Sequence, residues 1–191
     1  MTGKETGHRV RVRRWLRLAG AAAVLSLLGG LHAQARTTAP LTPAAFHPLP
    51  RADRILVLKR ARKLELIENG RVVKVFPIAL GENPIGAKRL QGDGKTPEGV
   101  YTVDARQSQS RYHLALHISY PNADDRAAAA AAHHAPGGDI EIHGLPNWYM
   151  GPLDPVRFDK DWTDGCISVG DRAIEQIWAA VAVGTPIEIR P

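Results

Sequence analysis

Short runs in which apolar residues stand together or alternate with polar ones recur along the chain from Arg54 onward. Ile55–Leu58 is wholly apolar, and Lys63–Glu68 mostly alternates. Asn69-Gly70, a dipeptide typical of two-residue hairpin turns, joins that run to Arg71–Phe76, so the pattern predicts a β-hairpin. Further strands are predicted at residues 100–103, 114–119, 140–142 and 186–189.

A short helix is expected after Asn122, a residue type preferred at the N-cap. Asp124 and Asp125 in its first turn suit the positive end of a helix dipole, and His133 and His134 suit the opposite end. This order of charges predicts a helix that ends near His134.

A second helix is expected to begin with Asp171 as its N-cap and to end at Gly184. Apolar side chains recur there at the spacing of one helical face, at Ile174, Ile177, Trp178 and Val181. Many short strands with two short helices predict an α+β domain that is mainly β, arranged as a β-sandwich or a partly closed barrel.

A basic segment followed by an uncharged one opens the chain. Arg9–Arg17 is rich in arginine, Leu18–Leu31 carries no charge, and Ala33-Gln34-Ala35 fits the small-residue pattern of a cleavage site. The uncharged segment is shorter than the ~18 residues expected of a membrane-spanning helix. Residues 1–35 are therefore predicted to be a signal peptide that directs the protein to the periplasm, with an uncleaved N-terminal anchor as the alternative.

Positive charge is concentrated in that predicted signal. The chain holds 25 basic and 19 acidic residues, a net charge of +6, of which residues 1–35 hold six basic residues and one acidic residue. The remainder has a net charge of only +1, which argues against a nucleic-acid partner. Arg36–Pro50 contains four prolines and predicts an extended tether over residues 36–53. Residues 54–191 then form one domain, without a further run apolar enough to span a membrane.

Cys166 is the only cysteine, so an exported chain of this sequence cannot form an internal disulfide. A thiol acts as a nucleophile only when a neighbouring group can take its proton, and His143, at the end of a predicted strand, is a candidate base. Gly165 beside the thiol would leave room for a substrate and for backbone N–H groups that stabilise an oxyanion. The alternative is that Cys166 is a small buried hydrophobic residue and His143 an ordinary polar one.

Four motifs, in their order along the chain, resemble those of the catalytic domain of the L,D-transpeptidase (YkuD) family. They are Thr96-Pro97-Glu98-Gly99, His143-Gly144, the run Thr163-Asp164-Gly165-Cys166-Ile167 and Gly184-Thr185-Pro186-Ile187. The resemblance extends over residues 54–191, the whole predicted domain. It implies the fold of that family and a cysteine acyltransferase that acts on peptidoglycan stem peptides without a metal or other cofactor.

The resemblance also implies roles for single residues. Cys166 attacks the carbonyl of the third stem residue, usually meso-diaminopimelate, and His143 takes the thiol proton and passes it to the leaving D-alanine. The backbone N–H groups of Cys166 and Gly165 hold the oxyanion. A second stem's amine then resolves the thioester and forms a cross-link. Substrate contacts are expected at Gly144, Trp148, Tyr149 and Thr163.

Asp164 departs from the family pattern, which usually has a histidine at this position. A carboxylate there would raise the pKa of the thiol by like-charge repulsion, so Asp164 points away, pairs with a cation or helps to receive an amine. The motif around it resembles a proteobacterial subgroup that includes enzymes releasing lipoprotein from the cell wall. A hydrolase of that kind, with a lipoprotein-linked substrate, is therefore an alternative, and a non-catalytic cell-wall-binding domain is a second.

Two other patterns are weaker. The histidines His113, His117, His133 and His134 lack the spacing of a metal site, so no metal is expected. Gly92–Thr96 contains glycines and a lysine but lacks the frame of a phosphate-binding loop. It is expected to be a turn beside the substrate groove.

Overall fold

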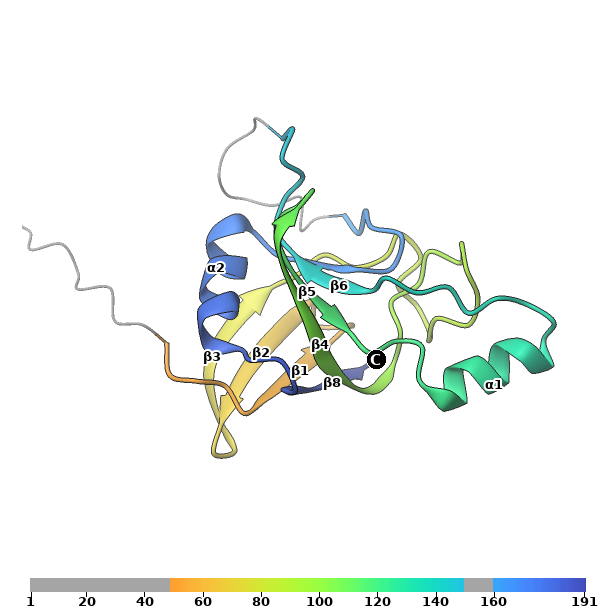
Figure 1. The fold of residues 1–191 in the computed structure, drawn as a ribbon, viewed down its shortest axis with the longest axis horizontal. Coiled ribbons are helices and arrows are strands. Elements are labelled where there is room, and N and C mark those ends of the chain that lie inside the picture. Colours follow the sequence, from red (N-terminus) through yellow and green to blue (C-terminus); the bar gives the residue numbers. More distant parts are fainter. Residues whose placement is uncertain (1–48, 150–159) are drawn as a thin grey trace, which may run out of the picture. The chain divides into compact units, whose positions relative to one another are not determined.

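The computed structural model describes residues 49–149 and 160–191, which form one eight-stranded mixed sheet and two helices (Figure 1). The predicted signal peptide and most of the predicted tether lie outside the described residues. The strands are β1 (Arg54–Leu58), β2 (Lys63–Glu68), β3 (Arg71–Pro77), β4 (Gly99–Ser110), β5 (His113–Ile118), β6 (Glu141–His143), β7 (Ile167–Ser168) and β8 (Pro186–Arg190). Within the described residues no helix is long and apolar enough to cross a membrane.

The predicted hairpin is confirmed. β2 and β3 pair in antiparallel register, and both turn residues have positive φ, 50° at Asn69 and 74° at Gly70. This geometry matches the right-handed twist of the strands and is tolerated by asparagine and glycine. β1 adds to β2 in antiparallel register and pairs in parallel with β8 on its other side.

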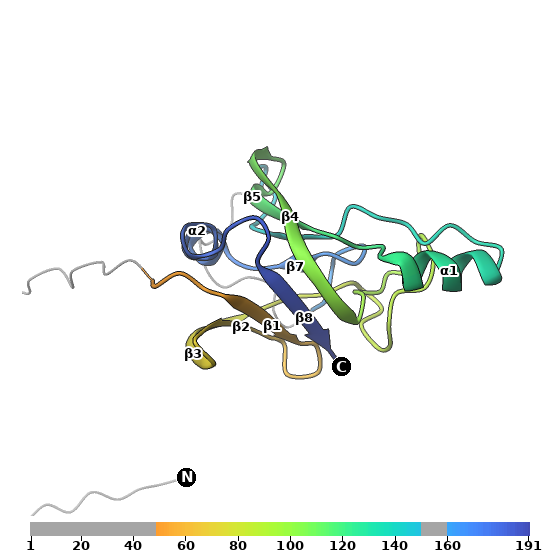
Figure 2. The ribbon, with the colours of Figure 1, turned by 60° about the horizontal axis from the view of Figure 1, so that its bottom comes forward.

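Strand β4 is much longer than the predicted run 100–103. Its first part pairs with β8 and its second part with β5, with a register shift between Val103 and Ala105 (Figure 2). Asp104–Gln109 is exposed and mostly polar, so the sequence offers no apolar period there. These residues become a strand because β5 pairs with them, which is a tertiary effect.

The sheet is not closed into a barrel. Its strand order is β3-β2-β1-β8-β4-β5-β6-β7, which leaves β3 and β7 at the two edges. Two isolated bridges, Ala79 with Ser168 and Gly81 with Thr163, nevertheless bring the segment after β3 against the segment around β7. The predicted partly closed barrel is therefore an open sheet whose two edge regions are joined by these two bridges. The bridges also position the loop that carries Cys166.

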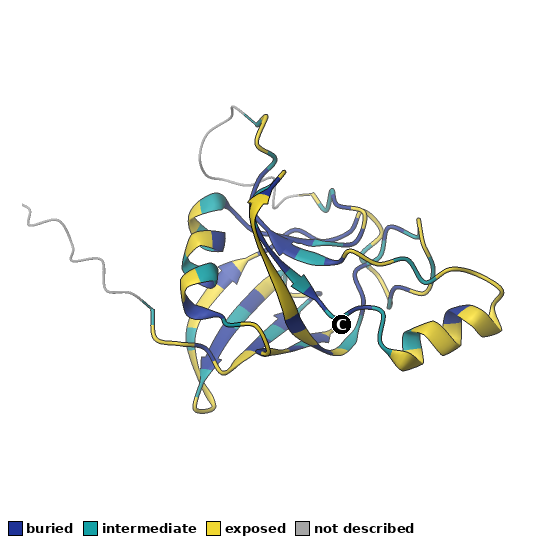
Figure 3. Cartoon of the chain, in the orientation of Figure 1, coloured by how far each residue is buried: buried dark blue, intermediate teal, exposed yellow. Residues whose placement is uncertain are grey.

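Helix α1 (Ala123–Ala131) begins as predicted. Asn122 accepts a hydrogen bond from the backbone N–H of Asp125, whose carboxylate accepts one in return from the N–H of Asn122. This capping box satisfies two N–H groups that the helix itself leaves unpaired. Only Ala129 of α1 is buried, so the helix lies against the domain along a narrow line (Figure 3).

Helix α2 (Asp171–Ala180) differs from the prediction at both ends. Its N-cap is Gly170, which makes no side-chain cap, and Asp171 is the first helical residue. The helix ends at Ala180, before Gly184, because Val181 has an extended backbone. Ile174 and Ile177 are fully buried in the core, which confirms the predicted apolar face.

The core lies between the sheet and α2 and is built mainly of β-branched and leucine side chains. It also reaches the last residues of the predicted tether. Leu49 packs against the core, and Ala52 is buried in it and donates its N–H to the carbonyl of Ala180. Residues 49–53 therefore belong to the folded domain.

Candidate active site

The parallel pairing of β6 with β7 brings the predicted nucleophile and base together. Ile142 lies opposite Ile167, and both are buried in the core. Because side chains alternate along a strand, the residues next to these isoleucines face the other side of the sheet. His143 lies opposite Ser168, two residues beyond Cys166, so the imidazole and the thiol share that face.

His143 is held in one tautomer. Its Nδ1 lies 2.7 Å from the carbonyl oxygen of Gly144, which can only accept a hydrogen bond, so Nδ1 carries the proton and Nε2 has a free lone pair. The ring is 1% exposed and packs against Tyr112 and Trp162, with centroid distances of 4.3 and 5.8 Å. Burial lowers the pKa of His143 to about 4, against a smaller opposing effect of the hydrogen bond to Gly144. The imidazole of His143 is therefore neutral near neutral pH.

The thiol of Cys166 is partly exposed and donates to the carbonyl oxygen of Asp139, 3.4 Å away. Its pKa is raised to about 11, mainly because surrounding protein displaces water from the sulfur. The backbone N–H of Glu141 opposes this shift, whereas the negative charges of Glu141, Asp164 and Asp139 add to it. At rest the thiol of Cys166 and the imidazole of His143 are therefore both uncharged.

Gly165, whose N–H is predicted to help hold an oxyanion, makes a hydrogen bond within the thiol loop. Its N–H donates to Oγ1 of Thr163, 3.1 Å away, and that hydroxyl in turn donates to the carbonyl of Cys166 at 2.7 Å. Thr163 is buried, and its hydroxyl braces the thiol loop through these two hydrogen bonds. The N–H of Cys166 has no hydrogen-bond partner among the described residues.

Gly165 is needed for close packing. Its φ is +137°, and a Cβ there would lie 2.6 Å from the carbonyl oxygen of Lys95. The turn Gly92–Thr96 therefore packs directly against the thiol loop, as predicted for a turn beside the groove. The carboxylate of Asp93 fills this turn by accepting hydrogen bonds from the N–H groups of Arg89, Leu90 and Lys95 and from Nζ of Lys88. The carboxylate of Asp93 would repel a bound anion and already occupies these N–H donors, so the turn is not a phosphate-binding site.

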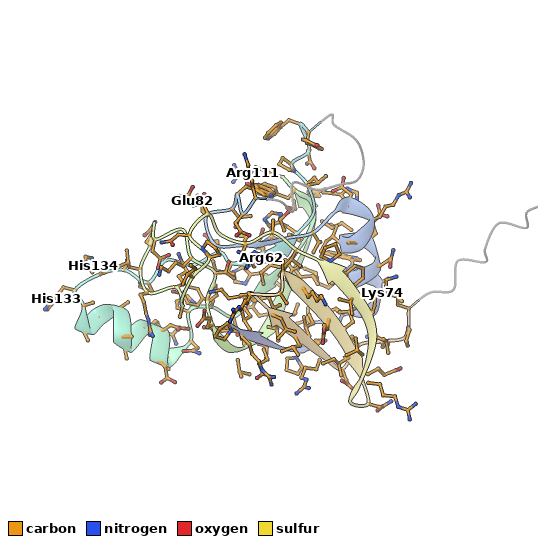
Figure 4. The ribbon with its side chains drawn as sticks, turned by 180° about the vertical axis from the view of Figure 1, so that it is seen from behind. Arg62, Lys74, Glu82, Arg111, His133 and His134 are labelled. Carbon is orange, nitrogen blue, oxygen red and sulfur yellow. The ribbon has the colours of Figure 1, made fainter. Side chains whose placement is uncertain are left out.

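An ion pair that the sequence did not indicate anchors the other end of the thiol loop. Asp161 accepts two hydrogen bonds from the guanidinium of Arg62, at 2.9 and 2.5 Å, and one from the backbone N–H of Leu80 at 2.9 Å. Figure 4 shows Arg62 in the body of the domain. Trp162, which packs against His143, follows Asp161 directly, so this pair fixes one wall of the site.

An apolar cavity of about 100 Å³ opens beside Trp162, the residue that packs against the imidazole of His143. It is lined by Leu145, Pro146, Trp148, Tyr149 and Trp162. The side chain of Trp148 is 78% exposed, and Tyr149 is partly exposed. The two predicted substrate contacts Trp148 and Tyr149 therefore border the cavity beside Trp162.

The remaining histidines lie apart from the thiol. His113 pairs with Glu175, and His117 pairs with Asp104. His133 and His134 are exposed at the outer end of α1 (Figure 4). Across residues 49–149 and 160–191, no group of three or more metal-ligating side chains is present.

The family model described as the L,D-transpeptidase catalytic domain (YkuD) matches residues 52–189. The provisionally named L,D-transpeptidase YafK of Escherichia coli (strain K12) is 36% identical over 133 residues, which are 66% of this chain and 46% of YafK. YqjB of Bacillus subtilis (strain 168), named in the same way, is 25% identical over 151 residues, 78% of each chain.

Solved structures have the same fold. Bd1075 of Bdellovibrio bacteriovorus is 30% identical with a TM-score of 0.52, over 74% of this chain and 48% of that one. The helical cell shape determining protein Pgp2 of Campylobacter jejuni is 24% identical with a TM-score of 0.54, over 75% of this chain and 50% of Pgp2. This chain thus spans about half the length of YafK and of these two structures.

Proposed function

The chain belongs to the L,D-transpeptidase catalytic domain family, and from the geometry of its thiol site we propose that it is a cysteine acyltransferase acting on peptidoglycan stem peptides. One observation carries this proposal. His143, fixed with its proton on Nδ1, and the partly exposed thiol of Cys166 lie on the same face of the β6–β7 pair. A neutral imidazole with a free Nε2 beside a thiol is the arrangement that general-base activation of a nucleophile requires.

In the first step, Sγ of Cys166 attacks the carbonyl carbon of the third stem residue, and Nε2 of His143 takes the thiol proton as the C–S bond forms. The oxyanion accepts a hydrogen bond from the N–H of Cys166. The peptide bond to D-alanine then breaks, and His143 returns the proton to the leaving nitrogen. The products are a thioester on Cys166 and free D-alanine.

In the second step, the side-chain amine of another stem attacks the thioester. His143 takes a proton from that amine and returns it to the departing sulfur, which restores the thiol. The negative charges of Asp139, Glu141 and Asp164 around the thiol attract a cationic ammonium group, which loses one proton to solvent before it attacks as the neutral amine. The negative charge around the thiol thus supports transfer of the acyl group to an amine. If water were the acceptor instead, the same site would act as a hydrolase.

The proposed substrate lies outside the cytoplasm, and the sequence of residues 1–35 is what supports export to the periplasm. The net charge of only +1 over residues 36–191 does not favour nucleic acid as a substrate.

The purified full-length chain should be incubated with tetrapeptide muropeptides and, separately, with lipoprotein-linked muropeptides, and the products read by mass spectrometry. Cross-linked dimers with loss of D-alanine, absent with Cys166→Ala, are the expected result. Monomers released from the lipoprotein without dimers would establish the hydrolase. If neither product depends on Cys166, the domain is a cell-wall-binding module and the proposal fails.

A further inference from the structure

The peptide that joins Gly144 to Leu145 is hydrogen-bonded at both of its polar ends. Its carbonyl accepts the Nδ1 proton of His143 at 2.7 Å, and its N–H donates to Oδ1 of Asp171 at 2.8 Å. Because a peptide unit is planar and rigid, its C=O and N–H groups keep a fixed orientation relative to each other, and so do the two hydrogen bonds they make. The carboxylate of Asp171 is thus connected to the imidazole through a single peptide.

Helix α2 delivers this carboxylate. Asp171 is its first residue, and the side chain turns toward Leu145 while the N-cap position is left to Gly170. The approach is so close that a Cβ on Gly144 would lie 2.6 Å from Oδ1 of Asp171 and 2.9 Å from the carbonyl oxygen of Tyr112. The N–H of Gly144 is also held, because it donates to the carbonyls of Tyr112 and Leu114. Glycine at position 144 is therefore required for the contact with Asp171.

A carboxylate on the N–H side of a peptide makes the carbonyl on the other side a stronger acceptor, because hydrogen bonds in a chain polarise one another. A stronger acceptor holds the proton of His143 on Nδ1 and stabilises the ring after Nε2 has taken a second proton. Among the described residues no carboxylate lies within hydrogen-bond distance of the ring itself. The Gly144–Leu145 peptide is therefore the route by which a negative charge reaches the base.

We propose that Asp171 is a positioning residue for His143, which it holds in the Nδ1–H tautomer, and stabilises as the imidazolium, through the Gly144–Leu145 peptide. The expected effect of Asp171 on the reaction rate rests on the proposed function. The expected effect of Asp171 on the tautomer and orientation of His143 rests only on the two hydrogen bonds and can be measured without any substrate.

Other titratable groups on the surrounding elements are engaged elsewhere or lie on other surfaces. Glu141 of β6 accepts a hydrogen bond from Gln107, and His113 of β5 pairs with Glu175 of α2. On the loop before β7, Asp161 pairs with Arg62, and Asp164 lies with Asp139 around the thiol of Cys166. The other groups are the exposed Arg172 of α2 and Arg111 of the β4–β5 turn, and the phenol of Tyr112 stacked on the ring. Substitution of Asp171 leaves all of them in place.

Three variants of the full-length chain separate positioning from a merely structural role. Asp171→Asn keeps an oxygen that can accept the N–H of Leu145 but removes the charge, whereas Asp171→Ala removes the acceptor as well. Asp124→Asn is the matched control, because Asp124 is also an acidic residue in the first turn of a helix but lies on α1. A helix-dipole effect alone would change stability in all three and leave the ring of His143 unaffected.

The readouts are the ring nitrogen resonances of His143 across a pH titration and the rate of acylation by a carbapenem-type β-lactam. Asp171→Asn is expected to lower the pKa of His143 and to slow acylation roughly tenfold, as for other groups that orient a functional histidine. Asp171→Ala is expected to populate the Nε2–H tautomer and to slow acylation further. Asp124→Asn should match the wild type in both.

If Asp171→Asn, which preserves the shape of the side chain, leaves the tautomer and the titration of His143 unchanged, the proposal is overturned even if Asp171→Ala fails to fold. If the resonances shift as expected but the wild type shows no acylation, Asp171 does position His143, and it is the proposed function that fails. A loss of acylation with unchanged resonances would assign Asp171 a role other than the one proposed.

Discussion

The buried imidazole makes the stability of the domain depend on pH in a defined direction. Its pKa is about 4 in the folded chain against an ordinary value of 6.5, because the ring is almost wholly removed from water. Between these two pH values the unfolded chain binds a proton that the folded chain does not. The contribution of His143 is therefore fully present above about pH 6.5 and is lost as the pH falls toward 4.

The magnitude follows from the size of the pKa shift. A shift of one pKa unit corresponds to about 1.4 kcal/mol, so the whole effect amounts to about 3 kcal/mol. Of this, about 2 kcal/mol is lost by pH 5, where the unfolded imidazole is nearly all protonated and the folded one is still nearly neutral. That is a large part of the free energy of unfolding of an ordinary domain, ~5–15 kcal/mol.

Urea unfolding of the wild type and of His143→Gln at a series of pH values measures this contribution. The free energy of unfolding of the wild type should fall by about 2 kcal/mol more than that of His143→Gln between about pH 8 and pH 5. His134→Gln, a substitution at an exposed histidine, is the matched control and should follow the wild type. A constant difference between wild type and His143→Gln across this range would refute the argument that His143 is buried in its neutral form.

Three further outcomes are expected. Alkylation of Cys166 by iodoacetamide should be slow near neutral pH and should rise through alkaline pH without a neutral plateau, because the pKa of the thiol is about 11; a plateau near pH 7 in the rate profile would contradict this. Thr163→Val should destabilise the domain by about 1–3 kcal/mol in urea unfolding, since it leaves the buried N–H of Gly165 without an acceptor, whereas Thr163→Ser should restore most of the loss. Asp161→Ala should lower the free energy of unfolding by about 2 kcal/mol and slow acylation, because the N–H of Leu80 loses its acceptor and the thiol loop its anchor; unaltered stability would show that the ion pair is not an anchor.

The elements that could be predicted from the sequence are those whose pattern is local. The hairpin of β2 and β3 follows from alternating residues on both sides of Asn69-Gly70, and α1 follows from the N-cap Asn122. The second half of β4 and the two residues of β7 become strands only because a partner pairs with them. Such segments have no alternation of apolar and polar residues, so the sequence pattern does not predict them as strands.

The site shows the same division. Residue chemistry was enough to select Cys166 and His143 as candidates, and the structure places both on one face. The hydrogen bond of the Gly165 N–H could not be predicted, because its acceptor is a side chain, and the orientation of that side chain cannot be read from a sequence. Arg62 and Asp161 are 99 positions apart, and they pair only because the edges of the sheet meet near β3 and β7.

The two perturbed groups of the site constrain how the thiol can react. With the pKa of Cys166 raised to about 11 and that of His143 lowered to about 4, a preformed thiolate–imidazolium pair is unfavourable. In the proposed reaction, transfer of the thiol proton then accompanies attack on a bound carbonyl, where the N–H of Cys166 would stabilise the charge that develops. A small alkylating reagent offers no such oxyanion, so slow alkylation would not argue against a catalytic cysteine. An acylating probe that places a carbonyl at the thiol is the informative reagent, and its rate depends on the orientation of His143, which the Gly144 carbonyl fixes.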